Sequence, residues 1–237
     1  MKVALLSDIH ANRHALEAVL EDLPAVDDVI CLGDVVGYGG DPKACVDVLR
    51  MAGWVTLAGN HDRACTDPTI LGWFNDQAAE ALRWTIEVLD ADRLQWLAEL
   101  PDQAAQDAVL LVHGSPREPT YEYVLDDRVA AANLDLLGPR VCFHGHTHIP
   151  GLFWDSDGMV RFDYDVGAFQ LRRPQLVNPG SVGQPRDGNP DASYLIWDTE
   201  AGSVDFRRVA YDREAAKWAI LDAGLPPRFA YRLDIGS

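Results

Sequence analysis

The chain has 237 residues, 48% of them hydrophobic, and its 20 basic and 37 acidic residues give a formal net charge of -17. This length suits one large domain, and we expect a single domain over residues 1–237. The negative charge argues against a broad nucleic-acid or anionic-membrane surface, although bound metal could still supply a local positive site. The apolar run near the N-terminus has only four residues, too few for a signal peptide or a membrane span, so we expect a cytoplasmic protein.

The first 150 residues alternate short apolar runs with amphipathic stretches. The runs predict strands at 3–6, 29–32, 55–58, 109–112 and 141–143. The amphipathic stretches predict helices at about 15–23, 42–51, 75–89 and 92–100, and from 126 or 127 onward. Continuous apolar strands separated by helices are typical of a mostly parallel sheet with both faces covered.

After Pro150 the pattern changes to short β-rich stretches separated by turns such as Asp-Gly and Pro-Gly. They lie near 152–155, 159–164, 166–171, 175–178, 193–198 and 203–210. A last helix is predicted at about 212–223, with an irregular tail behind it. We interpret the chain as an α/β protein in which an α/β half (about 1–150) and an antiparallel half (about 151–211) form two packed sheets, rather than two separate domains.

The four cysteines are scattered and form no C-x-x-C pair: Cys31, Cys45, Cys65 and Cys142. Two of them lie within apolar runs that read as buried strands. We therefore expect reduced core thiols, in preference to a disulfide or a zinc cluster.

Each of the five apolar runs ends in residues that can bind a metal. These are Asp8 with His10, Asp34, Asn60 with His61, His113, and His144 with His146. Ligands of open α/β sheets bind outside the carboxyl ends of the parallel strands, so these side chains can converge. Carboxylate, imidazole and amide oxygen without thiolate suit Mn, Fe, Ni, Co or Zn. A carboxylate shared by two such ions would make a binuclear centre suited to phosphoryl transfer.

Each of these residues also has a structural interpretation when taken alone. Asp8 could cap a turn, Asn60 could adopt a left-handed turn, and His113 could be a core histidine. The joint occurrence of all of them at strand ends favours the metal interpretation.

The motifs D-x-H, G-D, G-N-H-D, H and G-H-x-H occur here in order, and this pattern resembles the calcineurin-like metallophosphoesterase superfamily. The fragments "SDIHAN", "GDVVGYGGDP", "GNHDR", "VHGSPR", "GHTHIP" and "NPGSVGQPRDG" further resemble small bacterial phosphoesterases often grouped with diadenosine tetraphosphatases. The resemblance extends to about residue 188. It implies an αββα sandwich of two sheets flanked by helices, and two divalent metal ions, with manganese as the first choice.

Carried over position by position, the resemblance implies a role for each ligand. Asp8, His10 and His146 would hold the first ion, Asp34 would bridge, and Asn60, His113 and His144 would hold the second. A hydroxide between the ions would attack phosphorus, and His61 would act as the general acid. His148 fits no position in this scheme, so we expect it to have a hydrogen-bonding or surface role, or to support a ligand.

Several neighbours of the ligands are candidates for substrate contact or support. Asp62 could orient His61 or pair with Arg63. The predicted substrate contacts are Asn60, Arg63 and Arg117; solvent-exposed pairing is the alternative for the two arginines. Aromatic residues within 115–130, including Tyr121 and Tyr123, and within 151–173 could form the substrate walls or simply pack in the core.

The sequence leads to a metal-dependent phosphoric ester hydrolase acting on a small phosphorylated substrate: a phosphodiester, a nucleotide or a phosphomonoester. The alternatives are a non-catalytic scaffold on the same fold, a metal-dependent nuclease, which the acidic composition disfavours, and a protein Ser/Thr phosphatase. The last is weakened because Gly37 stands where those phosphatases carry the second Asp of G-D-x-x-D-R-G. Nothing in the sequence predicts an oligomeric state.

Overall fold

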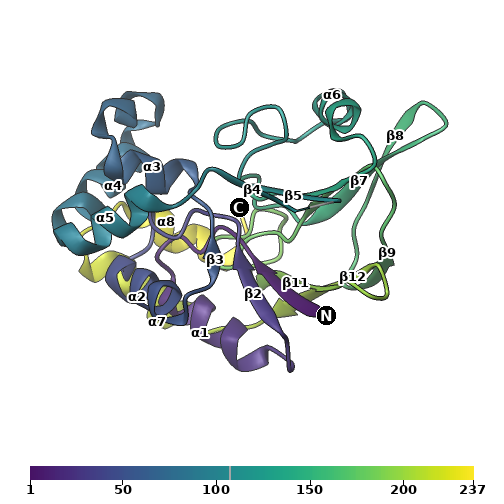
Figure 1. The fold of residues 1–237 in the computed structure, drawn as a ribbon. Coiled ribbons are helices and arrows are strands. Elements are labelled where there is room, and N and C mark those ends of the chain that lie inside the picture. The colour runs from purple at the N-terminus through teal and green to yellow at the C-terminus, as the bar shows by residue number, and fades with distance from the viewer. Residues whose placement is uncertain (107) are drawn as a thin grey trace.

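Two six-stranded mixed sheets pack face to face in the computed structural model, which describes residues 1–106 and 108–237 (Figure 1). The first sheet has the order β3 (Val55–Thr56), β2 (Asp28–Cys31), β1 (Lys2–Leu6), β11 (Ala192–Asp198), β12 (Ser203–Val209), β9 (Gly167–Gln170). The second has the order β4 (Gln103–Gln106), β5 (Val109–Val112), β6 (Val141–Phe143), β10 (Gln175–Asn178), β7 (Gly151–Ser156), β8 (Met159–Asp163).

Helices cover the outer faces of both sheets. Beside the first sheet lie α1 (Arg13–Asp22), α2 (Pro42–Ala52), α3 (Asn60–Thr66), α4 (Asp76–Val88), α5 (Ala91–Glu99), α7 (Arg213–Asp222) and α8 (Pro227–Tyr231), with the 3₁₀ helices η1 (Pro68–Trp73) and η2 (Arg232–Asp234). The outer face of the second sheet is covered by α6 (Asp127–Leu137) (Figure 1). The predicted αββα sandwich is therefore confirmed.

The alternation of side chains along the strands divides the core into three layers. Leu5 and Leu195 of the first sheet meet Phe143 and Val177 of the second in the layer between the sheets. The opposite faces of the same strands pack against helices, as Cys142 does beneath α6. All four cysteines are free and buried, as the sequence predicts.

The predicted strands are all present, but they are shared between the two sheets instead of forming one mostly parallel sheet. β1, β2 and β3 run parallel in the first sheet, and β5, β6 and β10 run parallel in the second. Antiparallel strands continue each group, with β11 beside β1 and β7 beside β10. Each sheet thus contains a group of parallel strands, and the carboxyl ends of the two groups lie at the same place, where the candidate ligands are found.

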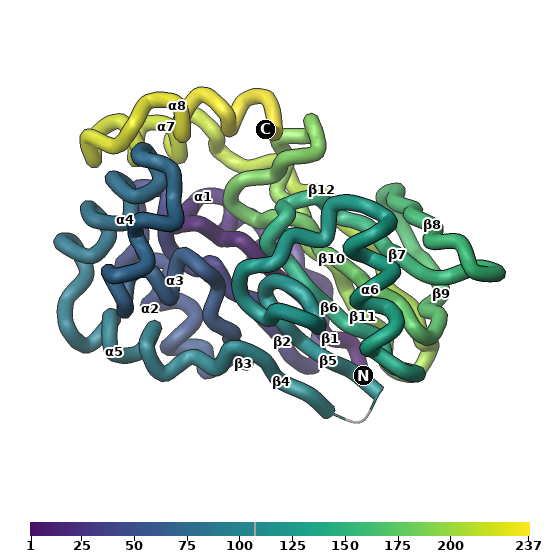
Figure 2. Tube along the Cα trace, turned by 90° about the horizontal axis from the view of Figure 1, so that it is seen from above, coloured from purple at the N-terminus to yellow at the C-terminus, as the bar shows by residue number. Residues whose placement is uncertain are grey.

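Five elements were not predicted from the sequence, and two of them are the 3₁₀ helices η1 and η2. The α3 helix has only seven residues, β4 has the weakly apolar sequence QAAQ, and α8 lies in the tail that was expected to be irregular. The tail instead folds back beside α7 (Figure 2), and its Phe229 packs on Tyr38 of the loop after β2 with ring centroids 4.8 Å apart. None of the described helices is both long and apolar enough to span a membrane.

Candidate metal centre

Loops from the carboxyl ends of β1, β2, β5 and β6 meet at one place, together with the first residues of α3. The amide of Asp8 donates to the carbonyl of Gly33 (3.0 Å), and the amide of His10 donates to the carbonyl of Asp34 (2.9 Å). The amide of Gly145 donates to the carbonyl of His113 (2.9 Å). These bonds join neighbouring loops within each sheet, and the amide of His146, which donates to Asp8 Oδ2 (3.1 Å), joins the loops of the two sheets. Ligand residues far apart in sequence therefore share one buried region.

The backbone is strained where it presents the candidate ligands. Eight non-glycine residues of the described chain have positive φ, and five of them are Asp8, His10, Asp34, His146 and His148. L-residues enter this left-handed region at a cost, and such residues concentrate at functional sites. Close packing adds to the constraint, because a Cβ atom on Gly145 would lie 1.9 Å from the hydroxyl oxygen of Ser7.

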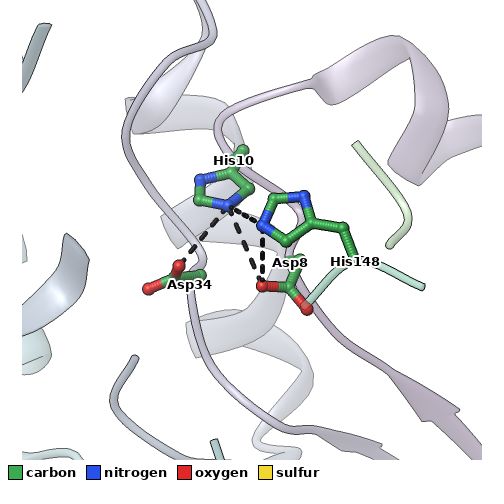
Figure 3. Close-up of side chains that lie close together, drawn as sticks. All are labelled: Asp8, His10, Asp34 and His148. Carbon is green, nitrogen blue, oxygen red and sulfur yellow. Dashed lines mark hydrogen bonds and ion pairs between the residues drawn. The ribbon is translucent and has the colours of Figure 1, made fainter. Parts of the chain in front are cut away.

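The first group of donor atoms comprises Asp8, His10, Asp34 and His148 (Figure 3). His148 Nε2 lies 3.2 Å from Asp8 Oδ1, and His10 Nε2 lies 3.4 Å from Asp34 Oδ2. The two ring nitrogens face each other at 3.1 Å. All four residues are buried, and their donor atoms are close enough to surround one cation.

The second group comprises Asp34, His113 and His146, with Asn60 at its side. His113 Nε2 lies 3.4 Å from Asp34 Oδ2, 3.1 Å from His146 Nδ1 and 3.3 Å from Asn60 Oδ1. The same oxygen of Asp34 therefore faces His10 in the first group and His113 in the second. That is the arrangement of a carboxylate that bridges two ions.

Backbone carbonyls select the ring nitrogen that each histidine presents. His10, His113 and His148 each donate through Nδ1 to a carbonyl, those of Val36 (3.1 Å), Leu32 (3.0 Å) and Gln184 (2.6 Å). His146 donates through Nε2 to the carbonyl of Tyr121 (3.1 Å). A neutral imidazole that donates at one nitrogen has a lone pair at the other, and this orientation is typical of metal-binding histidines.

The electrostatics of the centre also favour a cation. Burial raises the pKa of Asp8 to about 6, and the nearby Asp34 adds to the rise. Asp8 Oδ1 has no hydrogen-bond donor among the described residues. Burial opposes the charged form of His113, but the adjacent Asp34 outweighs it and raises the pKa of His113 to about 9, so a cation would take the place of a proton there. Two buried carboxylates and four inward imidazole nitrogens form a donor set that divalent ions of the Mn to Zn series accept. The residues present therefore fit two such ions.

The assignment of the loop after β6 has to be corrected by two residues. The sequence analysis placed His146 with Asp8 and His10, and His144 in the second group. The structure places His148 in the first group and His146 in the second, and His144 belongs to neither. His144 still follows the strand, with its amide donating to the carbonyl of Val177 (2.9 Å), and the chain turns toward the carboxylates only after it. The motif G-H-x-H is Gly145-His146-Thr147-His148, which the printed sequence already contains.

His61 lies beside the two groups and belongs to neither. Its amide donates to Asp34 Oδ1 (2.9 Å), and its ring packs edge-on against His10 and Phe74, with centroids 4.8 and 5.0 Å apart. Burial lowers the pKa of His61 to about 4, although Asp34 opposes the shift. A Cβ atom on Gly37 would lie 2.3 Å from His61 Nδ1, so only glycine leaves room for the imidazole.

The carboxylate of Asp62 accepts hydrogen bonds from backbone amides and not from another side chain. Its carboxylate accepts hydrogen bonds from the amides of Gly59 (2.9 Å), Val35 (3.2 Å) and Val36 (3.2 Å). Burial raises its pKa to about 7, and Asp34 adds to the rise while the amides oppose it. Within the described chain, neither the predicted bond to the His61 ring nor the pair with Arg63 is present, so Asp62 ties the Asp34 loop to the start of α3.

The two predicted arginine contacts point to other partners. Arg63 donates to Asp102 (2.8 Å) and to the carbonyls of Ala98 and Leu100 at the end of α5. Arg117 pairs with Glu122. Position next to a ligand in sequence therefore did not place either guanidinium in the pocket beside the donor groups.

A pocket of about 270 Å³ opens onto the second group and His61. Its walls are aromatic: Tyr38, Trp73, Phe74, Tyr121 and Tyr123, with Asn60, His61, Asn75 and His146 completing the lining. Tyr123 stacks on His146 with ring centroids 3.7 Å apart. Tyr121 and Tyr123 thus line the pocket as the sequence suggested, whereas Trp154 and Phe169 of the 151–173 stretch pack against the core between the sheets.

Five residues at the site were not singled out from the sequence as part of it: Tyr38, Trp73, Phe74, Asn75 and Arg186. Tyr38 follows Gly37 in the loop that carries Asp34, so its proximity to the motif was an available signal. Arg186 lies in "GQPRDG", next to the turn residues that the motif comparison covered. Trp73 carries no local sequence signal, because its place depends on how η1 folds over the site.

A family model described as the calcineurin-like phosphoesterase superfamily domain matches residues 1–202. The chain belongs to this superfamily. It is 35% identical to an uncharacterised protein of Methanocaldococcus jannaschii over 247 aligned positions, covering 99% of this chain and 98% of that one. Membership in this superfamily indicates a phosphoesterase.

Solved structures agree with the family assignment. A metallophosphoesterase from Sphaerobacter thermophilus is 38% identical, with a TM-score of 0.89 and coverage of 100% of this chain and 99% of that one. A hypothetical protein from Pyrococcus horikoshii has a TM-score of 0.81 at 21% identity, with coverage of 100% and 98%, and shares the fold. The superfamily fold therefore extends over the complete chain, including the segment after residue 202.

Proposed function

We propose that this member of the superfamily is a binuclear metal-dependent phosphoesterase that hydrolyses small phosphodiesters, with nucleotides and phosphomonoesters as related substrates. The observation that carries the proposal is the position of Asp34 Oδ2, 3.4 Å from both His10 Nε2 and His113 Nε2. One oxygen shared by two imidazole-lined groups is what two neighbouring divalent ions require.

Asp8, His10, Asp34 and His148 would hold one ion, and Asp34, Asn60, His113 and His146 the other. Mn²⁺ is the first choice, and Fe, Ni, Co and Zn also suit imidazole with carboxylate. When bound, such a pair of ions makes a water molecule acidic enough to act at neutral pH and withdraws electron density from the phosphoryl oxygens. The backbone carbonyls on the outer ring nitrogens keep the four histidines aimed at the ions.

His61 would donate a proton or hydrogen bond to the leaving-group oxygen from its place in the pocket wall. Its imidazole is neutral at pH 7 in the free protein, because burial holds its pKa near 4. A negatively charged phosphate in the pocket favours the protonated ring, so substrate binding raises this pKa toward the range useful for acid catalysis. Asp62 contributes by fixing the backbone on both sides of His61.

The surroundings of His61 favour small esters over phosphoprotein substrates. In protein Ser/Thr phosphatases of the superfamily an Asp supports the catalytic histidine, whereas Gly37 approaches the ring here and leaves Nδ1 without a partner among the described residues. The aromatic pocket suits the planar group of an aryl ester or a nucleotide.

The test is initial-rate hydrolysis of bis(p-nitrophenyl) phosphate and p-nitrophenyl phosphate by metal-stripped protein, with and without Mn²⁺. His61→Gln is compared with His14→Gln, a partly exposed histidine of α1. The proposal expects turnover that requires added metal, survives in the His14 variant and falls by at least about 10²-fold in the His61 variant. Absence of turnover with every divalent ion tried would point to a non-catalytic scaffold instead.

A further inference from the structure

Packing, and not a hydrogen bond to Nδ1, orients the imidazole of His61. This nitrogen is buried and has no partner among the described residues. Three rings surround the imidazole, with centroid distances of 4.4 Å to Tyr38, 4.8 Å to His10 and 5.0 Å to Phe74. In many active sites a hydrogen bond to the second ring nitrogen sets the orientation of the catalytic histidine. Here the contact with Tyr38, the nearest of the three rings, takes the place of that bond.

Tyr38 lies at the centre of a strained turn. The amide of Gly39 donates to the carbonyl of Gly37 (2.7 Å), and Tyr38 between them has a φ of 62°. A γ-turn with positive φ at its central residue is rare and costly. The loop is also tightly packed, because a Cβ atom on Gly39 would lie 2.3 Å from the carbonyl oxygen of His10. Glycine would adopt the central conformation at less cost, so the contacts of the tyrosine ring offset the strain.

The C-terminal segment packs against the same loop. Phe229 of α8 is buried and contacts the Tyr38 ring, with ring centroids 4.8 Å apart. Two residues further along the loop, a Cβ atom on Gly40 would lie 2.3 Å from the carbonyl oxygen of Ala219 in α7. Both helices follow residue 202, where the match to the superfamily model ends. A part of the chain outside that model therefore supports the ring that packs on the catalytic histidine.

We propose that Tyr38 and Phe229 are positioning residues: Phe229 supports the Tyr38 ring, and the Tyr38 ring fixes the orientation in which His61 reaches the leaving group. The proposal rests on the proposed phosphoesterase function and extends its machinery to the C-terminal segment. A misplacement of about 1 Å in a reacting group can lower a rate by about 10²-fold, so loss of this packing should lower kcat. The nearby ligand His10 has its own hydrogen bond to the carbonyl of Val36 (3.1 Å), which keeps its ring oriented without Tyr38.

The experiment is a double-mutant cycle between Tyr38→Leu and His61→Gln, with Mn²⁺-loaded protein and bis(p-nitrophenyl) phosphate as the substrate. We expect Tyr38→Leu to retain the metal content of the wild type and to lower kcat about 10-fold, with little change in KM. In the His61→Gln background the same substitution should change kcat less than about 2-fold, because no general acid is left to misplace. An equal loss of kcat in both backgrounds, a loss of metal or a change in KM alone overturns the proposal.

Further variants separate the ring from the hydroxyl and test the C-terminal contact. Tyr38→Phe keeps the ring and should retain at least about half of the wild-type kcat, whereas a loss equal to that of Tyr38→Leu overturns the proposal. Phe229→Leu should lower kcat about 3-fold and have no further effect in the Tyr38→Leu background. The matched control is Phe153→Leu, because Phe153 is a buried phenylalanine that pairs with Phe162 (4.7 Å) in the cluster beneath α6. An unchanged kcat in Phe229→Leu, or an equal loss in Phe153→Leu, overturns the role of the C-terminal segment.

A failure of the proposed function is recognised separately. If the wild-type protein hydrolyses no ester with any divalent ion, the phosphoesterase proposal fails, and crystal structures of Tyr38→Leu and Tyr38→Phe decide the positioning role alone. A His61 ring that is displaced in Tyr38→Leu and unmoved in Tyr38→Phe supports that role. Any other combination of ring positions overturns it.

Discussion

The loop after β6 carries three histidines, and they point to two different sides of the loop. His146 and His148 turn toward Asp8 and Asp34 and present lone pairs to the donor groups. His144 lines a separate pocket of about 260 Å³ on the other side, with Phe153 and Phe162 among its apolar neighbours. Its Nε2 has no hydrogen-bond partner among the described residues, and burial lowers its pKa to about 4.

The difference comes from the backbone and not from the residue type. Residues two apart on a strand share a face, so His144, His146 and His148 would point the same way if the strand continued. The strand ends at Phe143, and His146 and His148 have φ of 67° and 60°, which redirects both side chains. In the loop after β6, the two histidines that point toward the carboxylates are therefore the two whose backbone has the left-handed conformation.

Asp34→Asn should have the largest effect, because one carboxylate serves both donor groups. We expect metal content, measured by mass spectrometry after dialysis against Mn²⁺, to fall from two ions per chain to below one. Activity should fall by about 10⁴-fold, since binuclear phosphoryl transfer depends on both ions. Asp41→Asn, at a helix start outside the donor groups, is the control. Retention of two tightly bound ions in Asp34→Asn would rule out a bridging role.

His148→Gln against His144→Gln tests the two sides of the loop directly. The first change removes a donor of the first group, so we expect one ion to be lost and activity to fall by about 10³-fold. The second change should leave two ions bound. A result with the two variants exchanged, in which His144→Gln loses the ion, would restore the original assignment of the motif.

His61→Gln should separate chemistry from metal binding. Because His61 lies outside both donor groups, we expect two ions to remain while kcat falls by about 10²-fold. The loss should be smaller for esters with a good leaving group such as p-nitrophenolate than for alkyl esters, which need the proton more. Equal losses for both kinds of ester would contradict the general-acid role.

The comparison of His144 with His146 and His148 also shows how much of the structure the sequence alone predicts. Periodicity located the long helices and the strands, and most ligand candidates followed because they directly succeed apolar runs. The choice between His144 and His148 depended on backbone torsion in a loop, which hydrophobic pattern does not encode. The short α3 helix was missed because its residues are determined by bonds to Asp62 and Asp34 rather than by an apolar stripe.

The positions of the arginine side chains could not be predicted from the sequence either. Arg63 and Arg117 follow ligand segments in sequence, yet nearer partners, Asp102 and Glu122, occupy their guanidinium groups. Arg186 follows no ligand but is brought to His148 by the loop between β10 and β11. Ion pairing depends on tertiary contacts, so proximity along the chain could not distinguish a free arginine from a paired one.

Glu122→Gln should produce the smallest effect, and it tests the support of the aromatic wall. Glu122 accepts hydrogen bonds from Arg117 Nε (3.0 Å), Asn133 Nδ2 (2.9 Å) and Ser115 Oγ (2.7 Å). Burial opposes the charged form, but these bonds outweigh it and lower the pKa of Glu122 to about 2. Tyr121 and Tyr123 flank this carboxylate, so its replacement should raise KM several-fold with little change in kcat.

The sign of the pH dependence follows from that lowered pKa. A carboxyl group whose pKa is lower in the folded protein contributes stability above its unfolded value near 4.5 and loses it as pH falls toward 2. At pH 7 the free energy of unfolding of Glu122→Gln should be lower than that of the wild type by about 1–2 kcal/mol, and the gap should narrow between pH 4.5 and 2. Urea unfolding at several pH values measures this, with the exposed Glu80→Gln as control. If the difference in the free energy of unfolding stays constant down to pH 2.5, Glu122 stabilises the loop by packing. The charge of Glu122 would then not be needed to hold the aromatic pocket wall beside His146.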